Sequence, residues 1–110
     1  MTCQPATFNH TRGASFQVLT RIPSRFADGY FVGWDVKAQA RTDKGALLAT
    51  LEATWEDPDT TRVLALRCLD TSGWEVGPAS FDVRMTAPDG FVLYTTPFRF
   101  HVVKGVTADA

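Results

Sequence analysis

FDVRMTAPDG, residues 81–90, is the stretch that decides the fold. Its first six residues alternate apolar with polar side chains, and its last four form a turn sequence. Side chains two apart in a β-strand share one face, so the alternation predicts a strand with one buried side. Pro88 fixes φ at the first corner of the turn and Gly90 accepts a positive φ at its exit, which is typical of a type I turn followed by a bulge. The stretch therefore predicts one arm and the turn of a β-hairpin.

The chain beyond this turn continues the pattern. Phe98, Phe100 and Val102 alternate with polar residues, as expected for a return strand. The whole segment 91–103 is too long for one uninterrupted strand, and Pro97 lies inside it. Because proline donates no ladder hydrogen bond, we expect Pro97 to mark an edge or a bend where the chain passes from one sheet to the other.

Strand patterns also fill the rest of the chain. In residues 34–41, Trp34, Val36, Ala38 and Ala40 share one face, and the two small alanines indicate close packing against bulky residues of a facing sheet. Strands are also expected at residues 5–9, 15–22, 63–69 and 80–86. Gly77-Pro78 predicts a change of chain direction before the last of them. Residues 70–74 are compatible with a single helical turn capped by Asp70 or Thr71.

Residues 46–55 fit two structures. Their leucines and Trp55 recur at helical spacing, yet a strand returning after the Lys44-Gly45 turn fits equally well. We favour the strand because its neighbours on both sides are strands. The sequence then predicts an all-β, immunoglobulin-like antiparallel β-sandwich of about seven strands with little or no helix. A true immunoglobulin domain is not indicated, since the inter-sheet cysteine pair around a core tryptophan is missing.

Size and charge narrow the class of protein. The 110 residues suit one domain, with short arms at residues 1–6 and 106–110 that lack core patterning and would order only against a partner. The formal net charge is −1, from 11 basic and 12 acidic residues without a basic stripe. Direct nucleic-acid binding therefore has little electrostatic support.

The sequence gives no sign of export or membrane insertion. No apolar run approaches the about 20 residues that cross a bilayer, and residues 1–5 lack the apolar core of a secretory signal. We therefore expect a protein made in a cytosol, where thiols stay reduced. Cys3 and Cys68 can pair in principle, but we favour Cys68 as a small buried apolar residue at a strand end and Cys3 as part of a loose arm.

Candidates for catalysis are few. His10 and His101 are the only histidines, and His101 falls on the outward register of the last strand. The serines have no nucleophile-elbow context, and no zinc-protease or phosphate-loop spacing occurs. The acids that come closest to a cation site match no calcium-loop spacing and are read as a solvated loop; they are Glu56, Asp57, Asp59 and Asp70. The sequence predicts no enzyme, no metal site and no cofactor.

Protein interaction is better supported than catalysis. Trp34 belongs to the core by its register, whereas Trp55 and Trp74 lie next to loops, where a half-exposed indole commonly anchors an interface. The alternative that both indoles simply cap the open ends of the sandwich stays open. The basic residues are mostly arginine, eight Arg against three Lys, and arginine is favoured in protein interfaces because its planar fork pairs with carboxylates in fixed geometry.

The order of the short motifs resembles a known family. The motifs are Arg12-Gly13-Ala14-Ser15-Phe16, Asp28-Gly29, Gly33-Trp34, Gln39-Ala40-Arg41, Gly45-x-Leu47-Leu48-Ala49-x-Leu51, Thr71-x-x-Trp74-x-x-Gly77, Phe81-Asp82-Val83, Asp89-Gly90 and Val106-Thr107. This order is similar to that of the small β-sandwich proteins encoded among head, neck and tail genes of tailed bacteriophages and prophages.

The resemblance implies a non-enzymatic virion structural protein. Such a protein would be made in the bacterial host cytoplasm and incorporated in the virion as an adaptor or decoration subunit of the head, head-tail connector, tail or baseplate. It would form a homo-oligomer within a symmetric assembly and contact other virion proteins, without direct contact to nucleic acid or membrane. Both arms, together with Trp55, Trp74, Arg25 and Arg99, would supply the contacts.

Two other functions remain open. A carbohydrate- or receptor-binding module would stack loop aromatics on sugar rings, which requires Tyr30, Trp55 and Trp74 to cluster at one end of the sandwich. A small cytosolic enzyme or enzyme inhibitor would require His10 or His101 to meet an acid in a cleft.

Overall fold

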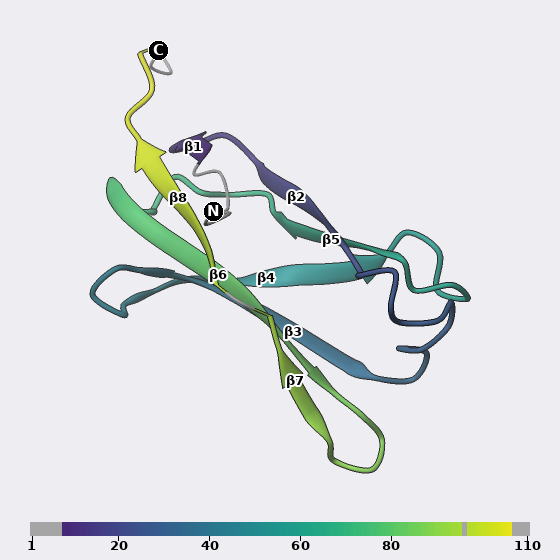
Figure 1. The fold of residues 1–110 in the computed structure, drawn as a ribbon. Coiled ribbons are helices and arrows are strands. Elements are labelled where there is room, and N and C mark those ends of the chain that lie inside the picture. Colours follow the sequence, from purple (N-terminus) through teal and green to yellow (C-terminus); the bar gives the residue numbers. More distant parts are fainter. Residues whose placement is uncertain (1–7, 96, 107–110) are drawn as a thin grey trace, which may run out of the picture.

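The computed structural model describes residues 8–95 and 97–106, and these form eight β-strands without a helix (Figure 1). The strands are β1 (Phe8–Thr11), β2 (Phe16–Arg21), β3 (Asp35–Thr42), β4 (Leu47–Trp55), β5 (Val63–Cys68), β6 (Gly77–Thr86), β7 (Val92–Tyr94) and β8 (Phe98–Val103). The predicted all-β, immunoglobulin-like sandwich is confirmed. The arm at residues 1–6 and nearly all of the arm at 106–110 lie outside the described residues.

The strands form two layers joined by one strand. The hydrogen-bonded order is β1-β8-β6-β3-β4-β5-β2, with β7 also paired to β6. The first half of β4 pairs with β3 and its second half, from Glu52, pairs with β5, so β4 passes from one layer to the other. All pairs are antiparallel except β1 with β8, which run parallel.

The predicted role of Pro97 is partly wrong. A break between β7 and β8 contains Pro97, as expected for a bend. Both strands nevertheless pair with β6, β7 along Arg84–Thr86 and β8 along Gly77–Phe81. The chain therefore bends but stays in the same layer, because β6 is long enough, at ten residues, to hold both short strands on one edge.

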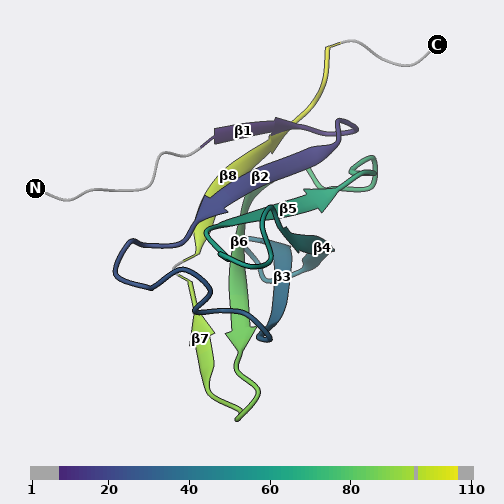
Figure 2. The same ribbon diagram turned by 90° about the vertical axis from the view of Figure 1, so that its right-hand side faces the viewer.

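The core lies between the two layers and includes two alanines of β3. Ala38 and Ala40 of β3 are at most 1% exposed. Aromatic rings from both layers meet in the same core: the Phe16 ring of β2 lies 5.8 Å from that of Phe81 and 5.3 Å from that of Phe100, centroid to centroid. Figure 2 shows β2 crossing over β8 and β6, the strands that carry those partners. Both alanines that were predicted to point inward are buried in this core.

Residues 46–55 resolve as a strand. Leu51 is buried with Ala49 and Ala53 half-buried on the same side, while Thr50, Glu52 and Thr54 face solvent. Leu47, which a buried helix face would have covered, is exposed. The alternation of period two thus prevails over helix propensity, because both edges of β4 find partner strands.

Three local expectations need correction. β6 begins at Gly77 rather than at residue 80, and the first strand runs to Thr11 rather than residue 9. Residues 70–74 form a hydrogen-bonded turn, in which Trp74 N–H donates to the Thr71 carbonyl at 3.0 Å, and not a helical turn. The Asp70 carboxylate accepts hydrogen bonds from the Ser72 hydroxyl and amide, and these lower its pKa.

Candidate interaction surface

One end of the sandwich gathers the β2–β3 loop, the β4–β5 loop and the β6–β7 hairpin. A chain of aromatic rings links them. Ring centroids of Tyr30 and Phe31 lie 4.9 Å apart, those of Phe31 and Trp34 4.9 Å apart, and those of Trp34 and Phe91 6.4 Å apart. The rings meet mostly edge to face, which is the favoured geometry for aromatic pairs. We call this end, with its exposed apolar residues, the apolar end.

Arg62 fixes the β2–β3 loop at this end. Its Nη2 donates to the carbonyl oxygens of Ile22 at 2.7 Å and Pro23 at 2.8 Å, and its Nη1 donates to the carbonyl of Phe26. Nη1 also lies 3.3 Å from an Asp28 carboxylate oxygen. A guanidinium is suited to this position because its planar fork offers several donors in fixed directions.

Thr61 and its neighbour Thr60 hold the same loop through hydrogen bonds. Thr61 is buried and has a φ of 50°, in the left-handed region that β-branched residues rarely adopt. Its Oγ1 accepts a hydrogen bond from Phe31 N at 3.3 Å, and Gly29 N donates to the Thr60 carbonyl at 2.7 Å. Phe31 is therefore held in the core, and its chain neighbours Tyr30 and Val32 point outward.

The side chains left outside form an apolar surface. Five large apolar residues of this end are each between 44% and 64% exposed; they are Tyr30, Val32, Phe91, Val92 and Tyr94. Single exposed apolar residues are ordinary on soluble proteins, but several from neighbouring segments mark a contact surface. The run Phe91-Val92-Leu93-Tyr94 carries the sequence signal, because four consecutive apolar residues in a strand cannot all face one core.

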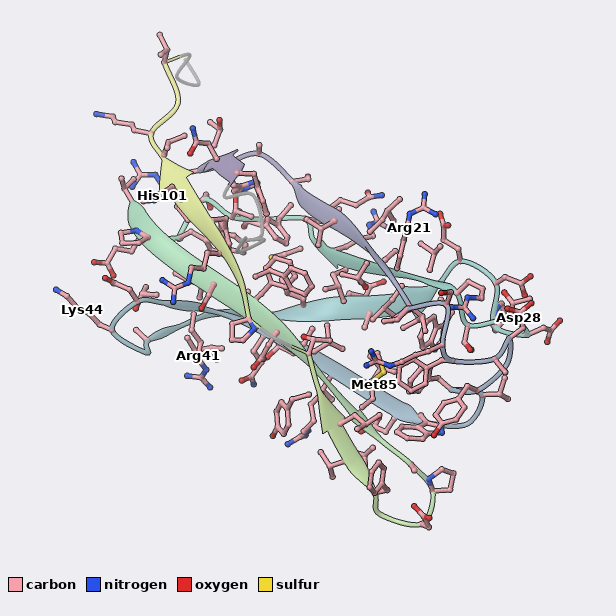
Figure 3. The ribbon with its side chains drawn as sticks, viewed as in Figure 1. Arg21, Asp28, Arg41, Lys44, Met85 and His101 are labelled. Atoms are coloured by element: carbon pink, nitrogen blue, oxygen red, sulfur yellow. The ribbon has the colours of Figure 1, made fainter. Side chains whose placement is uncertain are left out.

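A groove adjoins this surface between the β2–β3 loop and β7. Its volume is about 350 Å³, and its lining includes Phe26, Met85, Leu93 and Phe98. Arg25 lies at the groove with its guanidinium carbon 4.9 Å from the Phe26 ring centroid, in cation–π contact. Figure 3 shows Met85 beside the base of β7, next to a group of aromatic side chains. The predicted contact residue Arg25 thus belongs to the apolar end.

The other predicted contact residues are scattered. Trp55 is half-buried and stacks on Phe31, with centroids 6.2 Å apart, so it flanks the core of the apolar end. Trp74 is 3% exposed, and the prediction of a half-exposed anchoring indole at this position is therefore wrong. The centroid of its ring lies 5.3 Å from that of Phe16, so Trp74 packs with Phe16 and not with the aromatic rings of the apolar end. Arg99 is exposed on β8, on the outer face of the layer that contains β3, β6 and β8.

Neither histidine is placed for acid–base chemistry with a carboxylate. His101 is exposed on β8, and His10 is buried with its Nε2 3.2 Å from the Thr71 hydroxyl. Burial lowers the pKa of His10, against a smaller raising effect of a hydrogen bond to the Ala14 backbone. In residues 8–95 and 97–106 no ion pair reaches a histidine, and no group of three metal-ligating side chains forms.

The acidic residues do not gather around a common point. The Asp57 carboxylate accepts a hydrogen bond from Asp59 N at 2.9 Å, which closes a small turn in the β4–β5 loop. Asp70 lies in the β5–β6 connection and bonds Ser72. Within the described part of the chain, no helix is long and apolar enough to cross a membrane.

These features define an immunoglobulin-like β-sandwich. The crystal structure of CopC from Methylosinus trichosporium OB3b is similar to it, with a TM-score of 0.57, 17% identity, and coverage of 94% of this chain and 90% of that chain. A structure of murine CRIg covers 94% of this chain and 98% of that chain at 14% identity, with a TM-score of 0.42. No family model and no curated protein matches the sequence. The likeness to CopC is one of fold.

Proposed function

We propose that this protein is a non-enzymatic structural subunit of a tailed-bacteriophage or prophage virion that acts through protein–protein contacts. The exposed apolar end carries this proposal, because it offers a partner five apolar side chains beside a preformed groove. The loop under it is tied by Arg62 and Thr61, so little order has to be gained on binding. The virion setting is supported by the order of sequence motifs.

The carbohydrate-binding alternative has less support. It needs Tyr30, Trp55 and Trp74 at one end, but Trp74 is buried among Phe16 and Phe100. A ring that is only 3% exposed offers no face to a sugar. Tyr30 alone of the three is exposed.

Binding to the products of the flanking genes tests the proposal. The purified chain should bind at least one head, connector, tail or baseplate protein encoded beside it. The double variant Val32→Ser, Phe91→Ser should lose at least tenfold in affinity, since it removes apolar anchors that dominate interfaces of this kind. A matched control, Leu47→Ser with Leu69→Ser, removes two leucines that are exposed away from the apolar end and should bind as the wild type does.

Two results would overturn the proposal. One is a genomic neighbourhood without virion genes, combined with specific binding on a glycan array. The other is equal loss of binding in both double variants, which would show that the apolar end has no special role.

A further inference from the structure

The outer face of the layer containing β3, β6 and β8 carries uncompensated positive charge. Lys37 lies directly opposite Arg84 in the β3–β6 ladder, and Ser80 lies opposite Arg41 on one side and Arg99 on the other. We call these four cationic residues the basic face. Like charges directly opposite each other destabilise a sheet, so this arrangement costs the isolated fold some stability. Neighbouring strands are 4.7–4.9 Å apart, which puts Arg41 and Arg99 about 10 Å from each other.

The carboxylates nearby do not neutralise this face. Asp35 and Asp82 share it and Asp43 lines one of its hollows, so four cations meet three carboxylates and leave a net charge of +1. Among the described residues only Arg62 and Asp28 form an ion pair, and they lie at the apolar end. Arg41 is instead oriented by neutral groups, since its guanidinium donates to Gln39 Oε1 at 2.9 Å and to the Gly45 carbonyl at 3.0 Å.

Two hollows make the basic face concave. One, of about 270 Å³, is lined by Lys37, Asp82, Arg84 and Tyr94. The other, of about 620 Å³, has Arg41 and Arg99 in its lining, together with His101 and Asp43. In Figure 3, Arg41 and His101 lie toward the same side of the molecule as Lys44, and Asp28 lies at the opposite end. Arg41 of the larger hollow and Asp28 thus lie at opposite ends of the molecule.

An acidic loop projects from that opposite end. Glu56, Asp57 and Asp59 are all exposed in the β4–β5 loop, which meets the Asp28 segment through the Gly29 to Thr60 backbone hydrogen bond. The loop is already shaped, because the Asp57 carboxylate accepts from Asp59 N and Thr61 N donates to the Asp57 carbonyl, both at 2.9 Å. Glu56 and Asp59 make no side-chain bond within the described chain and remain available to a partner.

We propose that the basic face binds the acidic loop of a second copy of this chain. This proposal rests on the proposed structural function and names the partner. The contact joins two different surfaces of one chain, so it can repeat from copy to copy as a heterologous contact that forms a ring or a filament. Arginine forks on the basic face would pair with the carboxylates of Glu56 and Asp59.

Complementary charge reversals test this contact by sedimentation velocity over a range of protein concentrations. The face variant is Lys37→Glu with Arg84→Glu, which leaves the hydrogen-bonded Arg41 intact. The loop variant is Glu56→Lys with Asp59→Lys, which spares Asp57 because its carboxylate shapes the turn. Arg12→Glu with Lys104→Glu is the matched control, since both residues are exposed outside the two surfaces.

We expect the wild type and the control to associate with rising concentration, and less so at high salt. Each charge variant alone should associate roughly a hundredfold more weakly, because like charges then face each other. An equimolar mixture should regain association, since the acidic face of one variant meets the basic loop of the other and the unchanged surfaces also match. This recovery cannot come from a folding defect.

Three results would overturn the inference: a wild type that stays monomeric, charge variants that associate normally, or a mixture that does not recover. None of these results bears on the proposed function. That function is tested separately, by binding to the products of neighbouring genes and by the Val32→Ser, Phe91→Ser variant. That variant should still self-associate, because its changes lie outside the basic face and the acidic loop.

Discussion

Thr71 joins three segments through one hydroxyl group. Its Oγ1 accepts from Gly13 N at 2.9 Å and donates to the Ala14 carbonyl at 2.6 Å. The single hydroxyl proton is then used, so the third contact, to His10 Nε2, requires the histidine to donate. The neutral His10 ring therefore carries its proton on Nε2, and the fold selects that tautomer.

Replacing Thr71 with Val should cost about 1–3 kcal/mol of unfolding free energy, because the change leaves the buried Nε2–H of His10 and the part-buried Gly13 N–H and Ala14 carbonyl without their partner. Thr71→Ser keeps the hydroxyl and should cost clearly less. Urea unfolding followed by tryptophan fluorescence measures both. Equal losses for the two variants would show that the methyl group, and not the hydrogen-bonding, carries the effect.

His10 should make stability depend on pH. Its pKa is lowered in the folded protein by burial, so between that lowered value and the ordinary value near 6.5 the unfolded chain binds more protons. The free energy of unfolding should therefore rise as pH increases through this window and fall as the solution is acidified.

The measurement is urea unfolding at several pH values between about 5.5 and 7.5, above the titration of ordinary carboxylates. His10→Gln keeps a polar side chain without a proton to gain in this range, so its profile should be flat. A wild-type profile as flat as that of the variant would contradict the assignment.

At the scale of elements, Arg62 replaces regular secondary structure. The β2–β3 loop has turns but no strand, and three of its carbonyls bond to the Arg62 fork instead of to a ladder. Arg62→Ala should destabilise the fold by about 2 kcal/mol, as expected for hydrogen bonds to a charged group. Arg62→Lys should recover little, because an ammonium cannot reach all three carbonyls in that geometry.

Hydrogen exchange locates the effect of these variants. Amides of residues 22–34 should exchange faster in both, while those of β6 and β8 keep their protection relative to the lowered global stability. Full recovery by lysine would mean that charge pairing with Asp28 matters more than the carbonyl bonds.

Strands were predictable from sequence where alternation is long and one face is apolar. Residues 34–41 and 80–86 show this pattern, and β3 and β6 follow it with small shifts at their ends. Residues 46–55 carried two periodicities, and only pairing on both sides decided between them. Whether the chain changes layers at Pro97 depends on how many residues of β6 can pair with it, and the residues around Pro97 do not show this.

The interaction surface was less accessible to sequence reasoning. Trp74 follows Gly73 in a turn without alternation, so no local sequence pattern indicates that its indole packs against Phe16. The exposure of Phe91 and Tyr94 was signalled by the apolar run that contains them. The charge of the basic face arises only when Lys37 is brought opposite Arg84, a pairing of residues far apart in the sequence.

At the scale of the whole molecule, β4 couples the two layers. Because the first half of β4 pairs with β3 and its second half pairs with β5, the two layers cannot separate unless one of these two ladders breaks. Urea unfolding should therefore be one cooperative transition, with coincident midpoints by far-ultraviolet circular dichroism and by tryptophan fluorescence. Midpoints that differ beyond error would show that one layer unfolds first.

The parallel pairing of β1 with β8 has a mechanical consequence. Phe8 to Thr11 run alongside Phe100 to Val103 in the same direction, so the two strands enter and leave the molecule at opposite ends of one ladder. Tension that pulls the preceding and following chain apart loads those rungs together in shear, rather than opening them one by one like a zipper. A subunit stretched between two anchors would thus resist force through a ladder of only four residue pairs.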